Sequence, residues 1–157
     1  MAPHMGLGEE AAKGLRVGGL LHDVGKINIP AEILAKPGLL TTMEFELIKG
    51  HAAAGYDILA AIHFPWPVAE MAQQHHERLD GSGYPRGLKG EQILLEARLL
   101  AVADVVEAMA SHRPYRPALG LEAALAEVRG GAGMRYDAGA VAACEQVFAE
   151  GFVFSES

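Results

Sequence analysis

The sequence predicts an all-α domain. Apolar residues recur at intervals of three and four along most of the chain, which is the spacing of helices with one buried face. Glycine and proline separate these segments, and we find no convincing stretch that alternates apolar and polar residues as a half-buried strand does. Half of the 157 residues are apolar, so the chain is long and hydrophobic enough to form one compact domain with a real core.

The N-terminal part is expected to hold one helix and one short helical element. The helix should run over about residues 9–24, because Gly25 interrupts the pattern there. Its inner side should include Leu15, Gly18, Gly19 and Leu21. Pro30 favours a new first turn, and Pro37 with Gly38 ends that element after one or two turns.

A second long helix is predicted to begin after Thr41. The sequence TTME at 41–44 has the capping-box spacing, in which a threonine hydroxyl and a glutamate carboxylate satisfy free backbone N–H groups. From there one continuous helix should extend to the FPWP sequence, where Pro65 and Pro67 interrupt it. Its buried stripe is expected to contain Phe45, Ile48, Ala52, Tyr56, Leu59 and Ile62.

The rest of the chain is predicted to hold four more helices. The first spans about 68–75 and is followed by a glycine-rich loop at 80–90, after which a long apolar helix begins. Two amphipathic helices follow at 121–128 and about 138–149. Asp137 is the expected N-cap of the last helix.

Composition and charge exclude several classes of protein. A net charge of −7 argues against binding to a nucleic-acid polymer through a basic surface, although a few local cations could still hold a small nucleotide. Cys144 is the single cysteine, so no disulfide framework exists, which suits a reducing cytoplasm. No run approaches the roughly 18 apolar residues of a membrane span, and we therefore expect a cytoplasmic domain without membrane insertion.

Two residues that can carry chemistry stand together at the end of the first predicted helix. His22 and Asp23 interrupt the apolar run in the sequence LLHDVGK. Neighbouring helical residues diverge by about 100°, so the two side chains could reach two metals, with the carboxylate bridging them. For the dipeptide alone we favour the ordinary explanation, which is a histidine at the negative end of the helix dipole beside a solvated aspartate.

Further histidines and a second aspartate change this balance. His75 and His76 form another adjacent pair, of which one could be a core residue and the other a surface residue. His51 lies on an amphipathic helix, and Asp104 interrupts the apolar run LLAVADVV, where an unpaired carboxylate is costly. Brought together, these side chains supply imidazole and carboxylate ligands without thiolate, which suits Fe, Mn or Zn in a hydrolytic site.

A series of motifs connects these residues with a known family. In chain order they are HD at 22–23, DVGK at 23–26, KGH at 49–51, HHERLDGSGYPRGLKG at 75–90, AD at 103–104 and RPYR at 113–116. This series resembles the HD-GYP family over about residues 7–152. The resemblance implies an HD-domain helical bundle, here lacking the usual first helix of the family. Residues 6–157 would then be an N-terminally truncated HD-GYP domain, and residues 1–5 are expected to be vector-derived.

The resemblance implies a site for two divalent metals. Its expected ligands are His22, Asp23, His51, His75, His76 and Asp104. Asp23 is expected to bridge the two metals, with Fe or Mn favoured over Zn or Ni. Lys26 matches the lysine that contacts the scissile phosphate, where its charge would stabilise the charge developing on phosphorus. The ordinary alternative for Lys26 is a solvated loop lysine.

Substrate contacts are also implied by the resemblance. Gly83, Tyr84 and Pro85 form the GYP motif, in which glycine allows close backbone approach and an aromatic ring can meet a base. Arg113 and Arg116 carry guanidinium groups that suit phosphate oxygens and the Hoogsteen edge of guanine. Plain alternatives stay open for both sets, namely an ordinary turn and surface arginines.

The implied function is hydrolysis of cyclic di-GMP to pGpG, GMP or both by a metal-activated hydroxide, with Asp23 and Lys26 as catalytic residues. Two other functions stay open: a cyclic di-GMP-binding or protein-interaction module with impaired catalysis, and an HD phosphohydrolase that acts on another nucleotide. The family also suggests diguanylate cyclase domains as partners of the GYP loop, and a sensory or receiver domain upstream. Apolar surface left by the missing helix would favour a homodimer.

Overall fold

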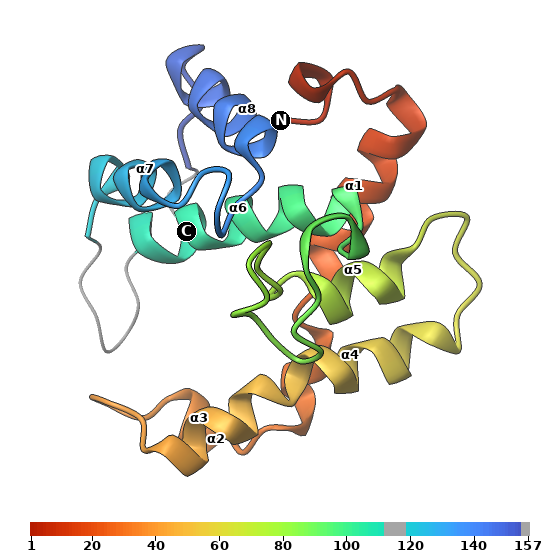
Figure 1. The fold of residues 1–157 in the computed structure, drawn as a ribbon. Coiled ribbons are helices and arrows are strands. Elements are labelled where there is room, and N and C mark those ends of the chain that lie inside the picture. Colours follow the sequence, from red (N-terminus) through yellow and green to blue (C-terminus); the bar gives the residue numbers. More distant parts are fainter. Residues whose placement is uncertain (112–118, 155–157) are drawn as a thin grey trace.

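A computed structural model describes residues 1–111 and 119–154, and within them the all-α prediction is confirmed (Figure 1). The α-helices are α1 (Glu9–Leu21), α2 (Ala31–Leu34), α3 (Thr42–Lys49), α4 (His51–Ala60), α5 (Val68–Gln74), α6 (Leu95–Ala110), α7 (Leu121–Gly130) and α8 (Ala138–Ala149). The same described ranges also contain the 3-10 helices η1 (Pro3–Met5), which precedes α1, η2 (Val24–Asn28) and η3 (Gly90–Gln92). None of the helices in these ranges is long and apolar enough to cross a membrane.

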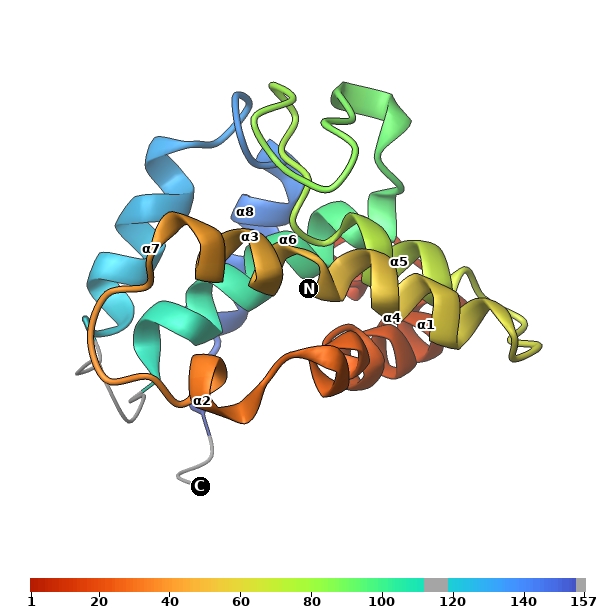
Figure 2. The same cartoon turned by 90° about the horizontal axis from the view of Figure 1, so that it is seen from below.

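Helix α6 runs through the middle of the molecule and separates two groups of helices (Figure 1). Helices α7 and α8 pack on one part of it, and their shared core includes Val102, Val106, Val128 and Cys144. Helices α1, α4 and α5 form the second group, in which α4 and α5 lie side by side (Figure 2). A smaller cluster around Leu59 fills this second group. Because α5 also packs on α6, residues far apart in the chain meet between the two groups.

The first helix ends three residues earlier than the sequence predicts. Helix α1 stops at Leu21, and the chain continues as η2 instead of extending to Val24. Gly25 lies beyond the end of α1, as predicted. Glycine is needed there because two backbone segments approach each other closely. A side chain at Gly25 would overlap the His51 carbonyl oxygen and the Gly55 nitrogen of α4. Glycine therefore lets η2 lie directly on α4.

The single helix predicted from Thr42 to Ile62 is wrong. The chain forms two helices, α3 and α4, which meet at Gly50. Because the break turns α3 away from the core, Phe45 is 44% exposed, and Ile62 beyond the end of α4 is 51% exposed. The capping box at the start of α3 is confirmed, since the Thr41 hydroxyl accepts from the Glu44 N–H at 3.3 Å and the Glu44 carboxylate accepts from the Thr41 N–H at 2.7 Å.

The remaining helices lie close to their predicted positions. Helix α5 ends one residue before the predicted end, and α7 continues two residues beyond Val128. Helix α8 has the predicted bounds, and its N-cap Asp137 accepts from the Ala140 N–H at 3.0 Å. Cys144, on α8, is buried in the core. Outside the segment divided at Gly50, the periodic elements therefore lie within about three residues of their predicted positions.

The contact at Gly25 gives a first testable prediction. A Gly25→Ala substitution should lower the free energy of unfolding by about 1–3 kcal/mol, because the new methyl group must push η2 away from α4. Urea denaturation measures this change. Gly130→Ala is a matched control, since an added Cβ there meets no atom within 4 Å, and it should leave stability unchanged or slightly raised. Equal stability of the Gly25→Ala variant and the wild type would contradict the proposed contact.

Candidate metal centre

Three of the predicted ligands are oriented in the same way by nearby backbone carbonyl groups. His22, His51 and His75 each place the ring atom Nδ1 at 2.6–2.7 Å from the backbone carbonyl oxygen three residues earlier. A carbonyl oxygen only accepts hydrogen bonds, so Nδ1 carries the hydrogen in each ring. The other nitrogen, Nε2, is then left with a free lone pair, which is the state of a histidine ready to bind a metal.

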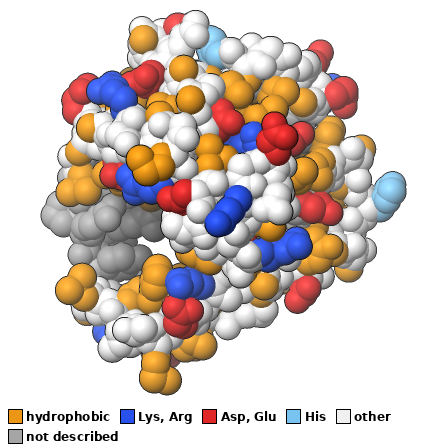
Figure 3. Space-filling view, in the orientation of Figure 1, with side chains coloured by type: hydrophobic (Ala, Val, Ile, Leu, Met, Phe, Trp, Pro, Cys, Tyr) orange, Lys and Arg blue, Asp and Glu red, His pale blue; other side chains and the backbone are white. Residues whose placement is uncertain are grey.

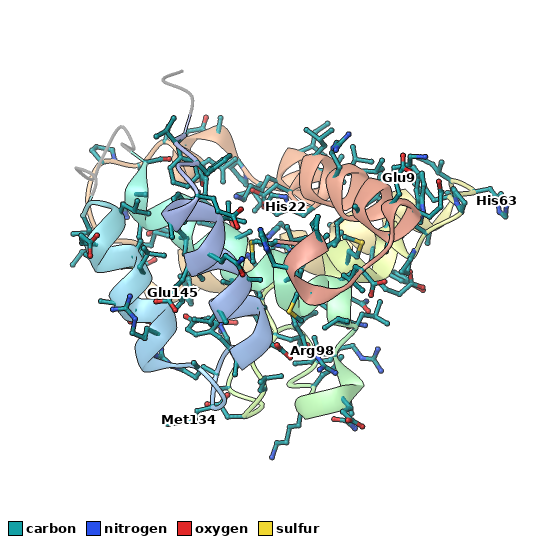
Figure 4. The ribbon with its side chains drawn as sticks, turned by 90° about the horizontal axis from the view of Figure 1, so that it is seen from above. Glu9, His22, His63, Arg98, Met134 and Glu145 are labelled. Atoms are coloured by element: carbon teal, nitrogen blue, oxygen red, sulfur yellow. The ribbon has the colours of Figure 1, made fainter. Side chains whose placement is uncertain are left out.

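These Nε2 atoms converge with the predicted aspartates. His51 Nε2 lies 3.4 Å from His75 Nε2 and 3.3 Å from Asp23 Oδ1. His22 Nε2 lies 3.4 Å from Asp23 Oδ2 and 3.7 Å from Asp104 Oδ1. The chain thus brings helices α1, α4, α5 and α6 to one place. Figure 4 shows His22 near the centre of the molecule, whereas His63 projects from its edge.

His76 completes the cluster through its ring contacts. Its ring centroid lies 3.9 Å from that of His75 and 5.0 Å from that of His51. Among the described residues, two groups have ligand atoms that all lie within 4.8 Å of one another. The first comprises His51, His75 and His76, and the second comprises His22, Asp23 and His75. The structure therefore gathers all six predicted ligands, while their coordination of a metal stays a prediction.

The chemical state of these atoms fits a divalent cation. His22 Nε2 and Asp23 Oδ1 are buried and have no hydrogen-bond partner, which is costly in a protein interior. The two Nε2 lone pairs of His51 and His75 also face each other at 3.4 Å, an arrangement that a shared cation or proton would stabilise. Imidazole and carboxylate donors without a thiolate suit Fe, Mn or Zn. The residues present can therefore hold divalent metal.

Burial keeps most of the histidines neutral. It lowers the pKa of His75 to about 4, with a further contribution from nearby His22. Burial likewise lowers the pKa values of His51 and His76 below the ordinary histidine value. Burial opposes ionisation of Asp104, yet the neighbouring His22 and the other histidines hold the pKa of its carboxyl below the usual range. At neutral pH these three histidines are thus neutral and Asp104 is charged, as metal binding requires.

His22 differs from the other rings because it lies between two carboxylates. Burial lowers its pKa, but the nearby Asp104 and Asp23 raise it by more, so the net shift is upward. The Nε2 atom of His22 is therefore a place where positive charge is favoured. A proton and a metal cation would compete for the same lone pair of this atom.

Lys26 lies at the edge of the cluster, next to Asp23. Its Nζ donates to Asp23 Oδ2 at 2.5 Å, and its side chain is about one-third exposed. The 3-10 helix η2 carries this lysine three residues after Asp23, and both side chains are partly open to solvent. The structure therefore puts a cation beside the predicted bridging ligand, as contact with a phosphate would require.

The GYP motif folds back onto the predicted ligands. The Tyr84 N–H donates to the His76 carbonyl oxygen at 3.2 Å, and the Tyr84 ring stacks on the His76 ring with centroids 4.7 Å apart. Gly83 lies so close to the backbone of residues 76–78 that a Cβ there would overlap it. The predicted residues Gly83 and Tyr84 therefore border the cluster. Whether they bind substrate stays a prediction.

The arginines of the RPYR motif cannot be placed. Arg113 and Arg116 lie in residues 112–118, outside the residues that the structure describes. Two other residues near the cluster received no role in the sequence analysis. Glu77 is buried beneath the glycine-rich loop, and Lys49 of the KGH motif has its Nζ 5.6 Å from the centroid of the Tyr84 ring. Their adjacency to predicted ligands in the sequence was the only signal that could have indicated them.

A cavity of about 530 Å³ opens beside the second ligand group. His22, Asp23, Asp104 and Glu107 line it together with mostly apolar side chains of α6, α8 and the C-terminal segment. Cys144 also lines this cavity, but burial raises the pKa of its thiol, which disfavours the nucleophilic thiolate. Three of the predicted ligands therefore face a cavity that is otherwise mostly apolar.

Comparison with curated proteins supports the motifs. The chain is 46% identical to a cyclic di-GMP phosphodiesterase response regulator, RpfG, of Xanthomonas campestris, over 87% of this chain and 37% of that protein. It is 45% identical to a cyclic di-GMP phosphodiesterase of Thermotoga maritima, over 87% of this chain and 38% of that protein. A 3'3'-cGAMP-specific phosphodiesterase of Vibrio cholerae is 46% identical over 77% of this chain and 28% of that protein. The chain thus spans less than two-fifths of the length of these relatives.

Solved structures share the fold. An HDG"Y"P protein from Bdellovibrio bacteriovorus superposes with a TM-score of 0.76 at 19% sequence identity, covering 94% of this chain and 47% of that chain. A cyclic GMP-AMP-specific phosphodiesterase from V. cholerae gives a TM-score of 0.67 at 20% identity, covering 94% of this chain and 42% of that chain. Residues 1–139 match the HD domain family. The resemblance read from the motifs is confirmed, and the chain belongs to the HD domain family.

Proposed function

We propose that this chain is a metal-dependent phosphodiesterase domain that hydrolyses cyclic di-GMP to pGpG, GMP or both. The observation that carries the proposal is the pair of buried atoms without hydrogen-bond partners, His22 Nε2 and Asp23 Oδ1, at the point where the six predicted ligands converge. Relatives with 45–46% identity are named cyclic di-GMP phosphodiesterases, which supports the substrate class.

Each residue has a proposed part in the reaction. Asp23 directs one oxygen toward His22 and the other toward His51, so its carboxylate can serve both ligand groups. Lys26 neutralises charge on the phosphate during attack by water. When bound, divalent metals would lower the pKa of a water molecule and polarise the phosphate. The Tyr84 ring supplies a flat surface for a guanine base, and Arg113 and Arg116 are kept as proposed phosphate or base contacts.

A second candidate substrate is 3'3'-cGAMP. A relative named for this substrate is as similar to the chain, at 46% identity, as those named for cyclic di-GMP. The two dinucleotides share the phosphodiester ring and differ in one base, so the metal cluster and Lys26 would act on both in the same way. Discrimination between them must come from residues that touch the base.

The proposed activity gives the second prediction. Purified protein supplied with Mn(II) or Fe(II) should convert cyclic di-GMP to pGpG or GMP, as measured by chromatography of the products. The same protein treated with a chelator should be inactive, because the histidine cluster then lacks its cation. A parallel reaction with 3'3'-cGAMP compares the two substrates by kcat/KM. Tight binding of cyclic di-GMP without turnover would show a binding module, and faster turnover of another nucleotide would show a different phosphohydrolase.

The bridging role of Asp23 gives the third prediction. Asp23→Ala should lower both the metal content and kcat/KM, the latter on the order of 100-fold or more, because one carboxylate faces both ligand groups. Metal analysis of the purified protein and steady-state kinetics measure the two effects. Asp57→Ala, at an exposed position on α4, is the matched control and should change neither. Retention of metal and turnover by a folded Asp23→Ala variant would show that the proposed role is wrong.

The proposed phosphate contact of Lys26 gives the fourth prediction. Lys26→Met should lower kcat about 100-fold while the protein keeps its metal, because the ammonium group acts on phosphate charge and is not itself a ligand. Metal content and the separate values of kcat and KM distinguish this outcome from that of Asp23→Ala. Unchanged kcat would favour the alternative of a solvated loop lysine.

A further inference from the structure

Glu77 carries a buried carboxylate whose two oxygens both bind backbone N–H groups of one loop. The residue is 2% exposed. Its Oε1 accepts from the Arg86 N–H at 2.7 Å, and its Oε2 accepts from the Leu88 N–H at 2.9 Å. These two hydrogen bonds replace the water that the buried carboxyl group has lost.

These two bonds hold the middle of a loop whose ends are held by other contacts. We call residues 80–90 the glycine loop. At its far end the Gly90 N–H donates to the Leu79 carbonyl oxygen at 3.0 Å. At its near end Asp80 Oδ1 accepts from the backbone and the hydroxyl of Ser82. Glu77 therefore ties the central part of the glycine loop to the helix end that carries the paired histidines.

The glycine loop in turn determines what lies against His76. Tyr84 stacks on the His76 ring with an interplanar angle of 29°. The other three histidines of the cluster are oriented by a backbone carbonyl three residues earlier, but among the described contacts His76 makes no such bond. Its ring orientation thus depends on packing against His75 on one side and Tyr84 on another.

We propose that Glu77 is a positioning residue, which holds the glycine loop so that Tyr84 keeps the His76 ring oriented for metal binding and borders the substrate site. This inference rests on the proposed function in taking His76 as a ligand. It goes further because it assigns a role to Glu77, which received none from the motifs. Glu77 points at backbone N–H groups of the loop, so its contribution to the site passes through Tyr84 and His76.

The test compares Glu77→Gln with a matched carboxylate elsewhere in the chain. The glutamine has the same shape, but its amide NH₂ group must face one of the two loop N–H groups. Asp137→Asn is the control, because Asp137 also accepts from a backbone N–H, that of Ala140 at the start of α8, and in addition pairs with Arg98 away from the cluster. Both substitutions weaken a hydrogen bond between a carboxylate and a backbone N–H. Only Glu77→Gln does so next to the predicted metal ligands.

Three measurements are made on the full chain: hydrogen exchange of the glycine loop, Mn(II) binding by calorimetry, and separate kcat and KM values at saturating Mn(II). For Glu77→Gln we expect loop exchange to rise about tenfold or more and the Mn(II) Kd to rise about tenfold. KM for cyclic di-GMP should rise more than kcat falls. Asp137→Asn should leave the loop exchange, the Mn(II) Kd and KM at wild-type values.

Two results would overturn the proposal. One is wild-type protection of the glycine loop in folded Glu77→Gln. The other is an opened loop with an unchanged Mn(II) Kd, which would limit Glu77 to a structural part. If Glu77→Gln does not fold, Gly83→Ala lifts the same loop from residues 76–78 without altering Glu77, and it must give the same changes. If the wild type does not turn over cyclic di-GMP, the proposed function is wrong. The proposal for Glu77 is then still tested by loop exchange and Mn(II) binding, which do not depend on turnover.

Discussion

The contact between two backbones at Gly25 is the constraint on which the site depends. Because this residue has no side chain, η2 lies directly on the first turns of α4, against His51 and Gly55. Asp23 stands at the start of η2, so the same contact brings its Oδ1 to 3.3 Å from His51 Nε2. The break at Gly50 contributes from the other side, since it makes His51 the first residue of α4.

Helix ends explain why the paired motifs can offer Nε2 to a common centre. The last carbonyl groups of a helix lack intrahelical partners. His22 is the C-cap of α1 and His75 is the C-cap of α5, so each ring can use such a carbonyl to hold its Nδ1–H. His51, just beyond α3, uses the carbonyl of Ile48 in the same way. The same hydrogen bond, from Nδ1–H to the carbonyl three residues earlier, therefore sets the tautomer of all three rings. No other side chain is needed for it.

The elements with a strong apolar period, and the capping box, could be predicted from the sequence because the determining interactions are local. The division at Gly50 could not, because apolar residues continue through it at helical spacing and only the packing of α4 on η2 selects the bend. The six candidate ligands were found through their motifs, and their convergence agrees with that reading. Glu77 was missed because its partners, Arg86 and Leu88, become neighbours only after the glycine loop folds back.

The charges of the site favour a cation over an anion as its first ligand. The chain carries a net charge of −7, and the centre itself holds two aspartates among imidazoles that are mostly neutral. Among the described residues, Lys26 is paired with Asp23, which offsets the positive charge of its ammonium group. The described residues of the centre would therefore attract a divalent cation more readily than a phosphate anion. A bound divalent cation would satisfy the buried atoms of His22 and Asp23 and would reverse the sign of the charge that a phosphate meets, so the proposed activity would need the cation to bind before the phosphate.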